Sequence, residues 1–376
     1  MMNINMVDLK GQYVKIQAKI DAAILKVIRD ANFINGPEVD SFTKQLSSYL
    51  GGSHVIACAN GTDALQIAMM AIGLEPGDEV IVPSFTYVAT AEVIALLHLK
   101  PLMVDVDPVS FNITRENIEQ AVGPKTKAIV PVHLFGQCAD MEPILALAKE
   151  KGLYVIEDAA QAIGAMYTFS DGTQKQAGTM GHIGCTSFFP SKNLGCYGDG
   201  GAIYTHDPVL AEKIKMISNH GQVKKYVHKF IGVNSRLDTI QAAILNIKLQ
   251  YLDQYSAARK SAADLYDQLL SGIDGLKTPV RAENSTHVFH QYTILVVNGK
   301  RDELKQYLEA AGIPVMIYYP IPLNEQEAFK GIGEVFGSLI ETKRLCASVL
   351  SLPIHTELTE QQQVFITDTV KSFFKS

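Results

Sequence analysis

Short apolar runs alternate with helix-like stretches from about residue 54 to residue 157, and this alternation restricts the fold more than any other feature. The runs that indicate strands cover residues 54–59, 79–83, 101–106, 128–134 and 153–157, and helical spacing covers residues 62–72, 88–97 and 141–150. Such βαβ order predicts an α/β protein with a mostly parallel central sheet between helices. Ligands of such sheets bind at the carboxyl ends of the strands.

The second half of the chain has a different pattern. A stretch rich in glycine and small residues, 186–202, predicts a strand, a loop and a strand, and a long functional loop. Helical spacing runs through residues 237–252 and continues through 255–270, and a strand (290–297) and a helix (302–311) follow. We therefore expect an N-terminal arm and a large domain over residues 1–250, and a small α+β domain over residues 251–376.

Composition excludes several classes of protein. The 376 residues carry a formal charge of -6 with Lys and Arg scattered among Asp and Glu, which gives no field for nucleic acid. The apolar stretches are too short to span a bilayer, and the N-terminus lacks a secretory signal, so we expect a cytoplasmic protein without membrane binding. Five cysteines without C-x-x-C spacing predict reduced, buried thiols, and the histidines show no metal-binding spacing.

Two residues have the properties expected of a site that forms a Schiff base with a carbonyl compound. Asp158 ends an apolar strand, where a carboxylate needs a partner; it is either a helix cap or structural ion pair, or it faces a cofactor cation. Lys192 lies among small and apolar residues, where desolvation would lower its pKa and make the amine nucleophilic. A carboxylate for the ring nitrogen and a Schiff-base lysine are what pyridoxal phosphate chemistry requires.

Other strand ends offer further contacts. Gly61 and Thr62 open a predicted helix, where backbone amides bind phosphate, although an ordinary N-cap explains them equally well. Ser187 could add a hydroxyl beside the lysine loop, and Tyr87 could stack on a planar ring. His133 could support a residue that contacts the ring, but we interpret it as a core histidine with its hydrogen bonds satisfied. The glycine motifs that bind dinucleotides or nucleoside triphosphates are absent.

Taken together, these segments resemble the DegT-type sugar aminotransferases, which belong to the fold-type I pyridoxal phosphate enzymes. The matching segments are NGTDAL (60–65), GDEVIVPSFTYVATA (77–91), KAIVPVHLFGQCADM (127–141), VIEDAAQAIGA (155–165), TSFFPSKNLGCYGDGGAI (186–203) and NSRLDTIQAAIL (234–245). The resemblance runs through most of the chain. It implies the fold of that superfamily, with a small C-terminal α+β domain.

The resemblance also implies roles for individual residues. Lys192 would form the internal aldimine and move the proton, Asp158 would pair with the pyridine nitrogen, and Gln161 would hydrogen-bond the ring hydroxyl. Gly61, Thr62 and Ser187 would hold the phosphate, with Tyr87 stacked on the ring. Asn234 would reach the phosphate of the neighbouring subunit's cofactor, which implies a homodimer with shared active sites. The amino donor would be L-glutamate, and the acceptor a nucleotide-linked keto-sugar of polysaccharide or lipopolysaccharide biosynthesis.

The loop with Ser191 before the lysine, together with residues 220–238, looks most similar to enzymes that aminate C3 of UDP-linked 3-oxo-N-acetylhexosamines, including the glucuronate form. Arg236 could bind a sugar carboxylate, and Tyr318 and Tyr319 lie in a loop that would contact the sugar, where many relatives carry histidine at position 318. A dTDP-3-oxo-6-deoxyhexose 3-aminotransferase is the alternative substrate class. A noncatalytic regulator that binds the cofactor is the alternative of another kind.

Overall fold

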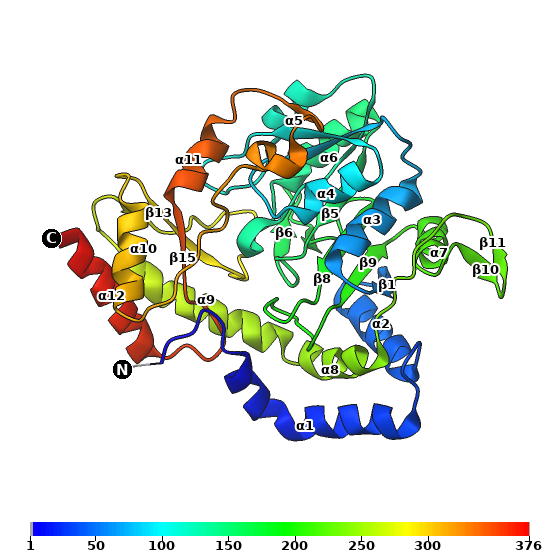
Figure 1. The fold of residues 1–376 in the computed structure, drawn as a ribbon, viewed down its shortest axis with the longest axis horizontal. Helices are drawn as coiled ribbons and strands as arrows, with labels where there is room; N and C mark the ends of the chain where they lie inside the picture. Colours follow the sequence, from blue (N-terminus) through cyan, green and yellow to red (C-terminus); the bar gives the residue numbers. More distant parts are fainter. Residues whose placement is uncertain (1–2, 376) are drawn as a thin grey trace.

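The computed structural model describes residues 3–375, and an eight-stranded sheet lies at its centre (Figure 1). The strand order is β1-β9-β8-β5-β4-β2-β3-β14, and only β9 runs antiparallel to its neighbours. The strands are β1 (His54–Cys58), β9 (Gly201–Thr205), β8 (Ile183–Ser187), β5 (Tyr154–Asp158), β4 (Thr126–Ile129), β2 (Glu79–Pro83), β3 (Lys100–Val104) and β14 (Glu334–Val335). The predicted mostly parallel sheet is confirmed.

Both faces of this sheet are buried under helices. Along β2, Val80 and Val82 enter one hydrophobic cluster, and Ile81 enters another on the opposite face, as the strand period of two requires. The first cluster contains residues of α3 (Gly61–Ile72), α4 (Ala89–Leu96) and α7 (Pro208–Ile217), and the second contains residues of α5 (Arg115–Ala121) and α6 (Met141–Lys151). A strand buried on both faces explains the continuous apolar runs.

A second, antiparallel sheet forms in the C-terminal part of the chain. It consists of β12 (Leu276–Lys277), β13 (Tyr292–Val296) and β15 (Val349–Leu352). A separate hydrophobic cluster joins it to α9 (Leu252–Leu269), α10 (Arg301–Ala310) and α12 (Glu360–Lys375). This arrangement agrees in kind with the small α+β domain expected over residues 251–376, while the boundary at residue 250 stays a prediction.

The remaining elements connect or flank these two sheets. The long helices are α1 (Leu9–Asp30), α2 (Pro37–Tyr49), α8 (Thr239–Leu249) and α11 (Ile340–Ser348). The short ones are the 3-10 turns η1 (Leu134–Gly136), η2 (Leu323–Glu325) and η3 (Glu327–Phe329), and the strands β6 (Met166–Thr168), β7 (Gln174–Gln176), β10 (Gln222–Lys224) and β11 (Val227–His228). Strands β10 and β11 form a hairpin that projects from the body of the molecule (Figure 1).

Two sequence-based expectations were wrong in detail. The strand expected over residues 128–134 ends at Ile129, because Pro131 has no N–H for the ladder and the chain then turns into η1. The continuous helical pattern over residues 237–270 is broken at Gln250 and Tyr251. Its first part packs against α1 and α2 and its second part against the small sheet, so the chain changes direction between two cores.

The topology gathers four loops at one edge of the large sheet. Strands β1, β2, β5 and β8 all run in the same direction, since β1 and β8 are each antiparallel to β9 between them. The segments that follow them begin with Ala59, Ser84, Ala159 and Phe188. Tyr87, Gln161 and Lys192 lie in these segments, Asp158 and Ser187 are the last residues of β5 and β8, and Gly61 and Thr62 open α3.

Candidate active site

Asp158 is the last residue of β5, and its carboxylate is held at the sheet edge. The residue is 7% exposed. Its Oδ2 accepts a hydrogen bond of 2.8 Å from the Thr90 hydroxyl, and its Oδ1 accepts one of 3.1 Å from the Ala160 amide. Within residues 3–375 the carboxylate caps no helix and forms no ion pair, so neither of the structural alternatives for this residue applies. A buried acid held only by neutral donors is placed to face a cation.

Lys192 lies in the loop between β8 and β9. Burial lowers the pKa of its ammonium group to about 8, although the charge of Asp158 acts in the opposite direction. Part of the side chain reaches solvent, but protein atoms surround the amino group. At pH 7 a lysine with this pKa is neutral in about one molecule in ten, against about one in three thousand for an ordinary lysine. The expected reactive amine is therefore present beside the expected carboxylate.

Close packing shapes the lysine loop. The Lys192 amide donates to the Phe189 carbonyl at 2.8 Å, which closes a tight turn. The Asn193 side chain donates to the Val288 carbonyl at 2.9 Å and ties the loop to the C-terminal part of the chain. A Cβ atom at Gly195 would lie 2.4 Å from the carbonyl oxygen of Pro190, so only glycine fits there. These contacts explain why the loop is rich in small residues.

The N-terminus of α3 and the end of β8 form a small cradle. Asn60 caps the helix by accepting the Asp63 amide at 2.8 Å. The amides of Gly61 and Thr62 come before the Asp63 amide in the first turn of α3. At this position a helix has no carbonyl oxygen that could accept their hydrogen bonds. A Cβ atom at Gly61 would lie 2.7 Å from the Cβ of Ser187, so the two backbones approach as closely as glycine allows. Free amides, a hydroxyl and the helix dipole at one place suit a phosphate group.

Aromatic residues and Gln161 form another wall of the site. Gln161 donates from Nε2 to the Tyr319 hydroxyl at 3.1 Å, and its Oε1 accepts the Phe135 amide at 2.8 Å. The Tyr319 ring lies 6.4 Å from that of Tyr87, which is 56% exposed, and 6.0 Å from that of Tyr318. Burial raises the pKa of Tyr319, so its hydroxyl stays protonated. The structure thus brings four of the predicted site residues into contact.

Asn234 and Arg236 are placed differently. Asn234 is exposed and forms a β-bridge with Asn219 at the base of the projecting hairpin. Between the two residues, Ser235 accepts the Ala59 amide at 3.0 Å, next to the start of α3. Over the described range 3–375, no hydrogen bond or ion pair joins Asn234 or Arg236 to the predicted site residues.

Sequence reasoning missed Thr90 and gave no separate role to Glu157. Thr90 lies in the first turn of α4 and supplies the hydroxyl that holds Asp158. Glu157 faces the other side of β5 and is fully buried. Strand alternation could have indicated this, because adjacent residues at the end of a strand buried on both faces point to opposite sides. The interpretation of His133 as a satisfied core histidine is confirmed, since both of its ring nitrogens have partners.

The cysteines agree with the sequence-based interpretation. All five are free and buried. The Cys196 thiol donates to the Phe188 carbonyl at 3.0 Å, and burial raises its pKa to about 11, so it packs rather than reacts. In the described part of the chain, no group of three His, Cys, Asp or Glu side chains is arranged to hold a metal ion. The helices described include none with the length and apolarity to cross a membrane.

Comparison with known proteins gives one consistent family. The model of the DegT/DnrJ/EryC1/StrS aminotransferase family matches residues 14–371. The chain is 48% identical over 355 residues to the UDP-2-acetamido-2-deoxy-3-oxo-D-glucuronate aminotransferase of Pseudomonas aeruginosa, covering 94% of this chain and 96% of that protein. It is 46% identical over 376 residues to a pleiotropic regulatory protein of Geobacillus stearothermophilus, covering 100% and 99%.

Solved structures agree. The crystal structure of NtdA from Bacillus subtilis with its bound cofactor PMP, the amino form of pyridoxal phosphate, has a TM-score of 0.87 and 34% identity. The alignment covers 96% of this chain and 82% of that one.

Proposed function

Because the chain belongs to the DegT/DnrJ/EryC1/StrS aminotransferase family, we propose that it moves an amino group from L-glutamate to C3 of a UDP-linked 3-oxo-N-acetylhexosamine or its glucuronate form. One observation carries the proposal. Lys192 is desolvated and has a pKa of about 8, and the charge of the buried Asp158 carboxylate acts on it. Both residues lie at the edge of the sheet where ligands of such folds bind.

The residues present fit pyridoxal phosphate, the cofactor of this family. Gly61 and Ser187 approach each other too closely for a Cβ atom at Gly61, and the cradle that they form offers amides and a hydroxyl to a phosphate. Thr86 is 2% exposed, and its buried hydroxyl has no hydrogen-bond partner in the described chain, which leaves a polar group for a ligand. When bound, the cofactor supplies an electron sink that stabilises negative charge on the amino-bearing carbon.

The chain's own residues then divide the work. We assign to Asp158 the contact with the ring nitrogen of the cofactor, and the negative charge of the carboxylate would keep that nitrogen protonated. Thr90 holds the carboxylate in place. Gln161 would donate to the ring hydroxyl while Tyr319 and the Phe135 amide fix its orientation. Lys192 would bind the cofactor's carbonyl carbon and later carry a proton between the amino-bearing carbon and the cofactor's C4′ carbon. Its lowered pKa permits this proton transfer near neutral pH.

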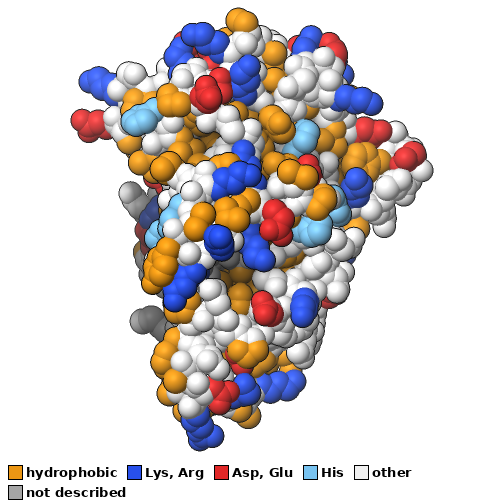
Figure 2. All heavy atoms as spheres, turned by 90° about the vertical axis from the view of Figure 1, so that its right-hand side faces the viewer, with side chains coloured by type: hydrophobic (Ala, Val, Ile, Leu, Met, Phe, Trp, Pro, Cys, Tyr) orange, Lys and Arg blue, Asp and Glu red, His pale blue; other side chains and the backbone are white. Residues whose placement is uncertain are grey.

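A homodimer is part of the proposal, and the hairpin supports it. Tyr226 is 83% exposed and Ile231 is 88% exposed, an unusual amount of apolar surface on a segment that projects from its own subunit. Figure 2 views the molecule from that side and shows apolar, basic (Lys or Arg) and histidine side chains across the middle of the face, with acidic side chains among them. Asn234 and Arg236 follow the hairpin and would serve the neighbouring subunit's site, so both would act across the interface.

The test is an absorption spectrum of the purified protein with pyridoxal phosphate, before and after L-glutamate. Wild type should show a visible band that shifts toward the near-ultraviolet with glutamate, and the Lys192→Ala variant should lack that band. Lys248→Met is the matched control, because Lys248 is also buried and burial lowers its pKa to about 8, yet it lies on α8 and the charge of Asp158 is not among the causes of its shift. Loss of the band in Lys248→Met but not in Lys192→Ala would refute the assignment.

Two further outcomes separate the alternatives. A panel of UDP- and dTDP-linked keto-sugars, added to the amino form of the protein, should restore the visible band with the UDP-linked 3-oxo-N-acetylhexosamines. Restoration only by a dTDP-3-oxo-6-deoxyhexose would select the alternative substrate class. A wild-type band that no amino donor shifts would support a regulator that binds the cofactor without transamination. A cytoplasmic location stays a prediction.

A further inference from the structure

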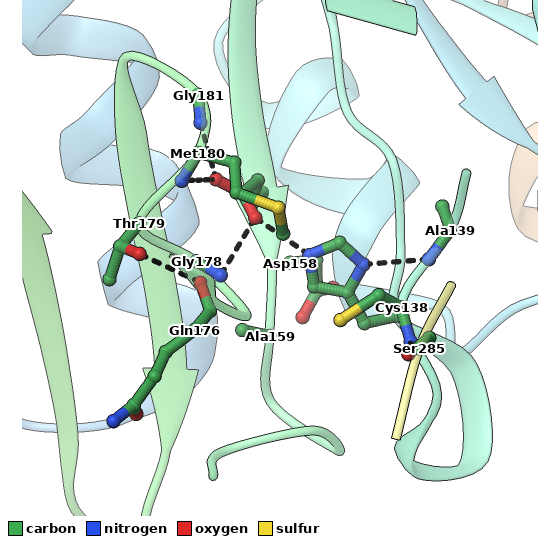
Figure 3. A network of polar contacts seen from close by, with 12 residues as sticks. Cys138, Ala139, Asp158, Ala159, Gln176, Gly178, Thr179, Met180, Gly181 and Ser285 are labelled. Carbon is green, nitrogen blue, oxygen red and sulfur yellow. Dashed lines mark hydrogen bonds and ion pairs between the residues drawn. The ribbon is translucent and has the colours of Figure 1, made fainter. Parts of the chain in front are cut away.

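Glu157 is a fully buried carboxylate that the chemistry proposed above does not use. It precedes Asp158 on β5 and is 0% exposed. Figure 3 shows the surroundings, where several donors from two separate segments converge on one pair of carboxylate oxygens. An ionised carboxylate taken out of water is costly unless its lone pairs are filled, so this group has a strict set of partners.

Four donors fill those lone pairs. Oε1 accepts the amides of Met180 and Gly181, and Oε2 accepts the Gly178 amide at 2.7 Å. The fourth donor is Nε2 of His133, at 2.8 Å from Oε2. Four N–H groups aimed at one group leave no acceptor for a carboxyl proton, so the glutamate is bound as a carboxylate.

The histidine has a defined tautomer. Its Nδ1 accepts the Ala139 amide at 3.1 Å, so the ring proton must lie on Nε2, from which it donates to Glu157. His133 is 0% exposed and follows strand β4. Glu157 therefore clamps together the turn that enters β8 and the segment that leaves β4, on either side of its own strand.

The His133 end of this clamp leads to the residues that would hold the cofactor ring. The His133 backbone amide donates to the Asp158 carbonyl at 3.0 Å, which joins the histidine to the residue assigned to the ring nitrogen. Two residues later, the Phe135 amide holds the Gln161 side chain, which is assigned to the ring hydroxyl. One hydrogen bond, between His133 and Glu157, thus fixes the segment that contacts both Asp158 and Gln161.

We propose that Glu157, acting through its bond to His133, is a positioning residue that sets the places of Asp158 and Gln161 against the cofactor ring. The inference rests on the proposed function, because it presumes that a pyridine ring binds there. Replacing Glu157 by glutamine removes the charge and turns one acceptor oxygen into a donor, which must face one of the four N–H groups. The contact with His133 is the easiest of the four to lose, because it comes from a side chain, whereas the other three come from backbone amides.

The experiment measures the dissociation constant of pyridoxal phosphate from the full-length protein by titration of the cofactor-free form. Glu157→Gln and His133→Phe should each raise it by about tenfold, the equivalent of one lost charge-assisted hydrogen bond. The double variant should be little worse than either single one, since both act through the same bond. The visible band of the bound form should also shift, because the ring contacts move.

Asp267→Asn is the matched control. Asp267 accepts the Tyr292 hydroxyl and a nitrogen of Arg281 in the C-terminal part of the chain, away from the sheet edge. It should lower the melting temperature of the cofactor-free protein while leaving the dissociation constant within about twofold of wild type. If Glu157→Gln and His133→Phe lower the melting temperature as Asp267→Asn does and change the dissociation constant no more than it does, the role is structural and the inference is overturned.

Failure of the proposed function has a different signature. In that case wild type itself would show no lysine-dependent band. A wild-type band together with an unchanged affinity in both His133→Phe and Glu157→Gln would overturn the positioning role alone. If Glu157→Gln does not fold, the His133→Phe variant decides, because it leaves the carboxylate and its three backbone donors in place.

Discussion

Replacing Lys192 by methionine should stabilise the cofactor-free protein at neutral pH although it abolishes the proposed chemistry. Burial lowers the pKa of this lysine from 10.5 to about 8, which means that the folded state disfavours the charged form. A shift of that size corresponds to at most about 3 kcal/mol of destabilisation at pH 7. Because the side chain reaches solvent in part, we expect a gain of about 1–3 kcal/mol in the variant.

The gain should depend on pH in a defined direction. Below pH 8 the lysine is charged in both the folded and the unfolded state, so the full penalty applies to wild type. Between about pH 8 and pH 10.5 the unfolded chain still binds a proton that the folded protein has released, so wild-type stability rises with pH. Above that window the lysine is neutral in both states, and the difference between the two proteins from this source should vanish.

The assay is denaturant unfolding of the two cofactor-free proteins at the same protein concentration, at pH 7 and at about pH 10. Lys248→Met serves as a comparison, because burial lowers the pKa of Lys248 to about 8 as well. That lysine lies 5.2 Å from the centre of the Tyr197 ring, a favourable contact that should reduce its gain. A Lys192→Met variant that is less stable than wild type at pH 7, or a difference that does not change with pH, would refute the reasoning.

Three further variants test the remaining parts of the site and fold. Gly61→Ala places a methyl group 2.7 Å from the Cβ of Ser187, and cofactor titration should show at least a roughly tenfold weaker complex, while an unchanged dissociation constant would contradict the phosphate cradle. Thr90→Val removes the hydroxyl that holds Asp158 Oδ2 at 2.8 Å, and single-turnover absorbance with L-glutamate should slow by about tenfold, with the melting temperature as the check on folding. Arg259→Met removes a buried guanidinium whose Nη1 donates to three carbonyl oxygens at 3.0–3.3 Å, so denaturant unfolding should show a loss of about 2–4 kcal/mol, and a loss below about 1 kcal/mol would mean that these bonds contribute little.

The environments of Lys192 and Asp158 were predictable because the local sequence already contains their cause. An acid at the end of an apolar strand must lie where the interior meets solvent, and a lysine among small and apolar residues must lose water on folding. The structure bears out both environments. The parallel sheet was predictable for a similar reason, since strands buried on both faces read as continuous apolar runs.

The surroundings of these residues were not predictable in the same way. Thr90 is a small polar residue in a helix, and nothing local distinguishes it from a solvent-facing threonine until α4 is packed against β5. The helical pattern across Gln250 is continuous in sequence, and only the presence of two separate cores decides that the chain turns there. Asn234 and Arg236 depend on a neighbouring subunit in the proposed dimer, so their roles lie beyond a single folded chain.

From the sequence alone we could predict the class of the fold, the edge of the sheet expected to bind a ligand, and the two residues proposed to carry the chemistry. These depend on hydrophobic periodicity and on local polarity, which short segments of chain already express. The contacts that hold those residues became visible only in the folded chain. The bonds from Thr90 to Asp158, from Phe135 to Gln161 and from His133 to Glu157 join residues 24 to 68 positions apart, and such pairs meet only after the sheet has assembled.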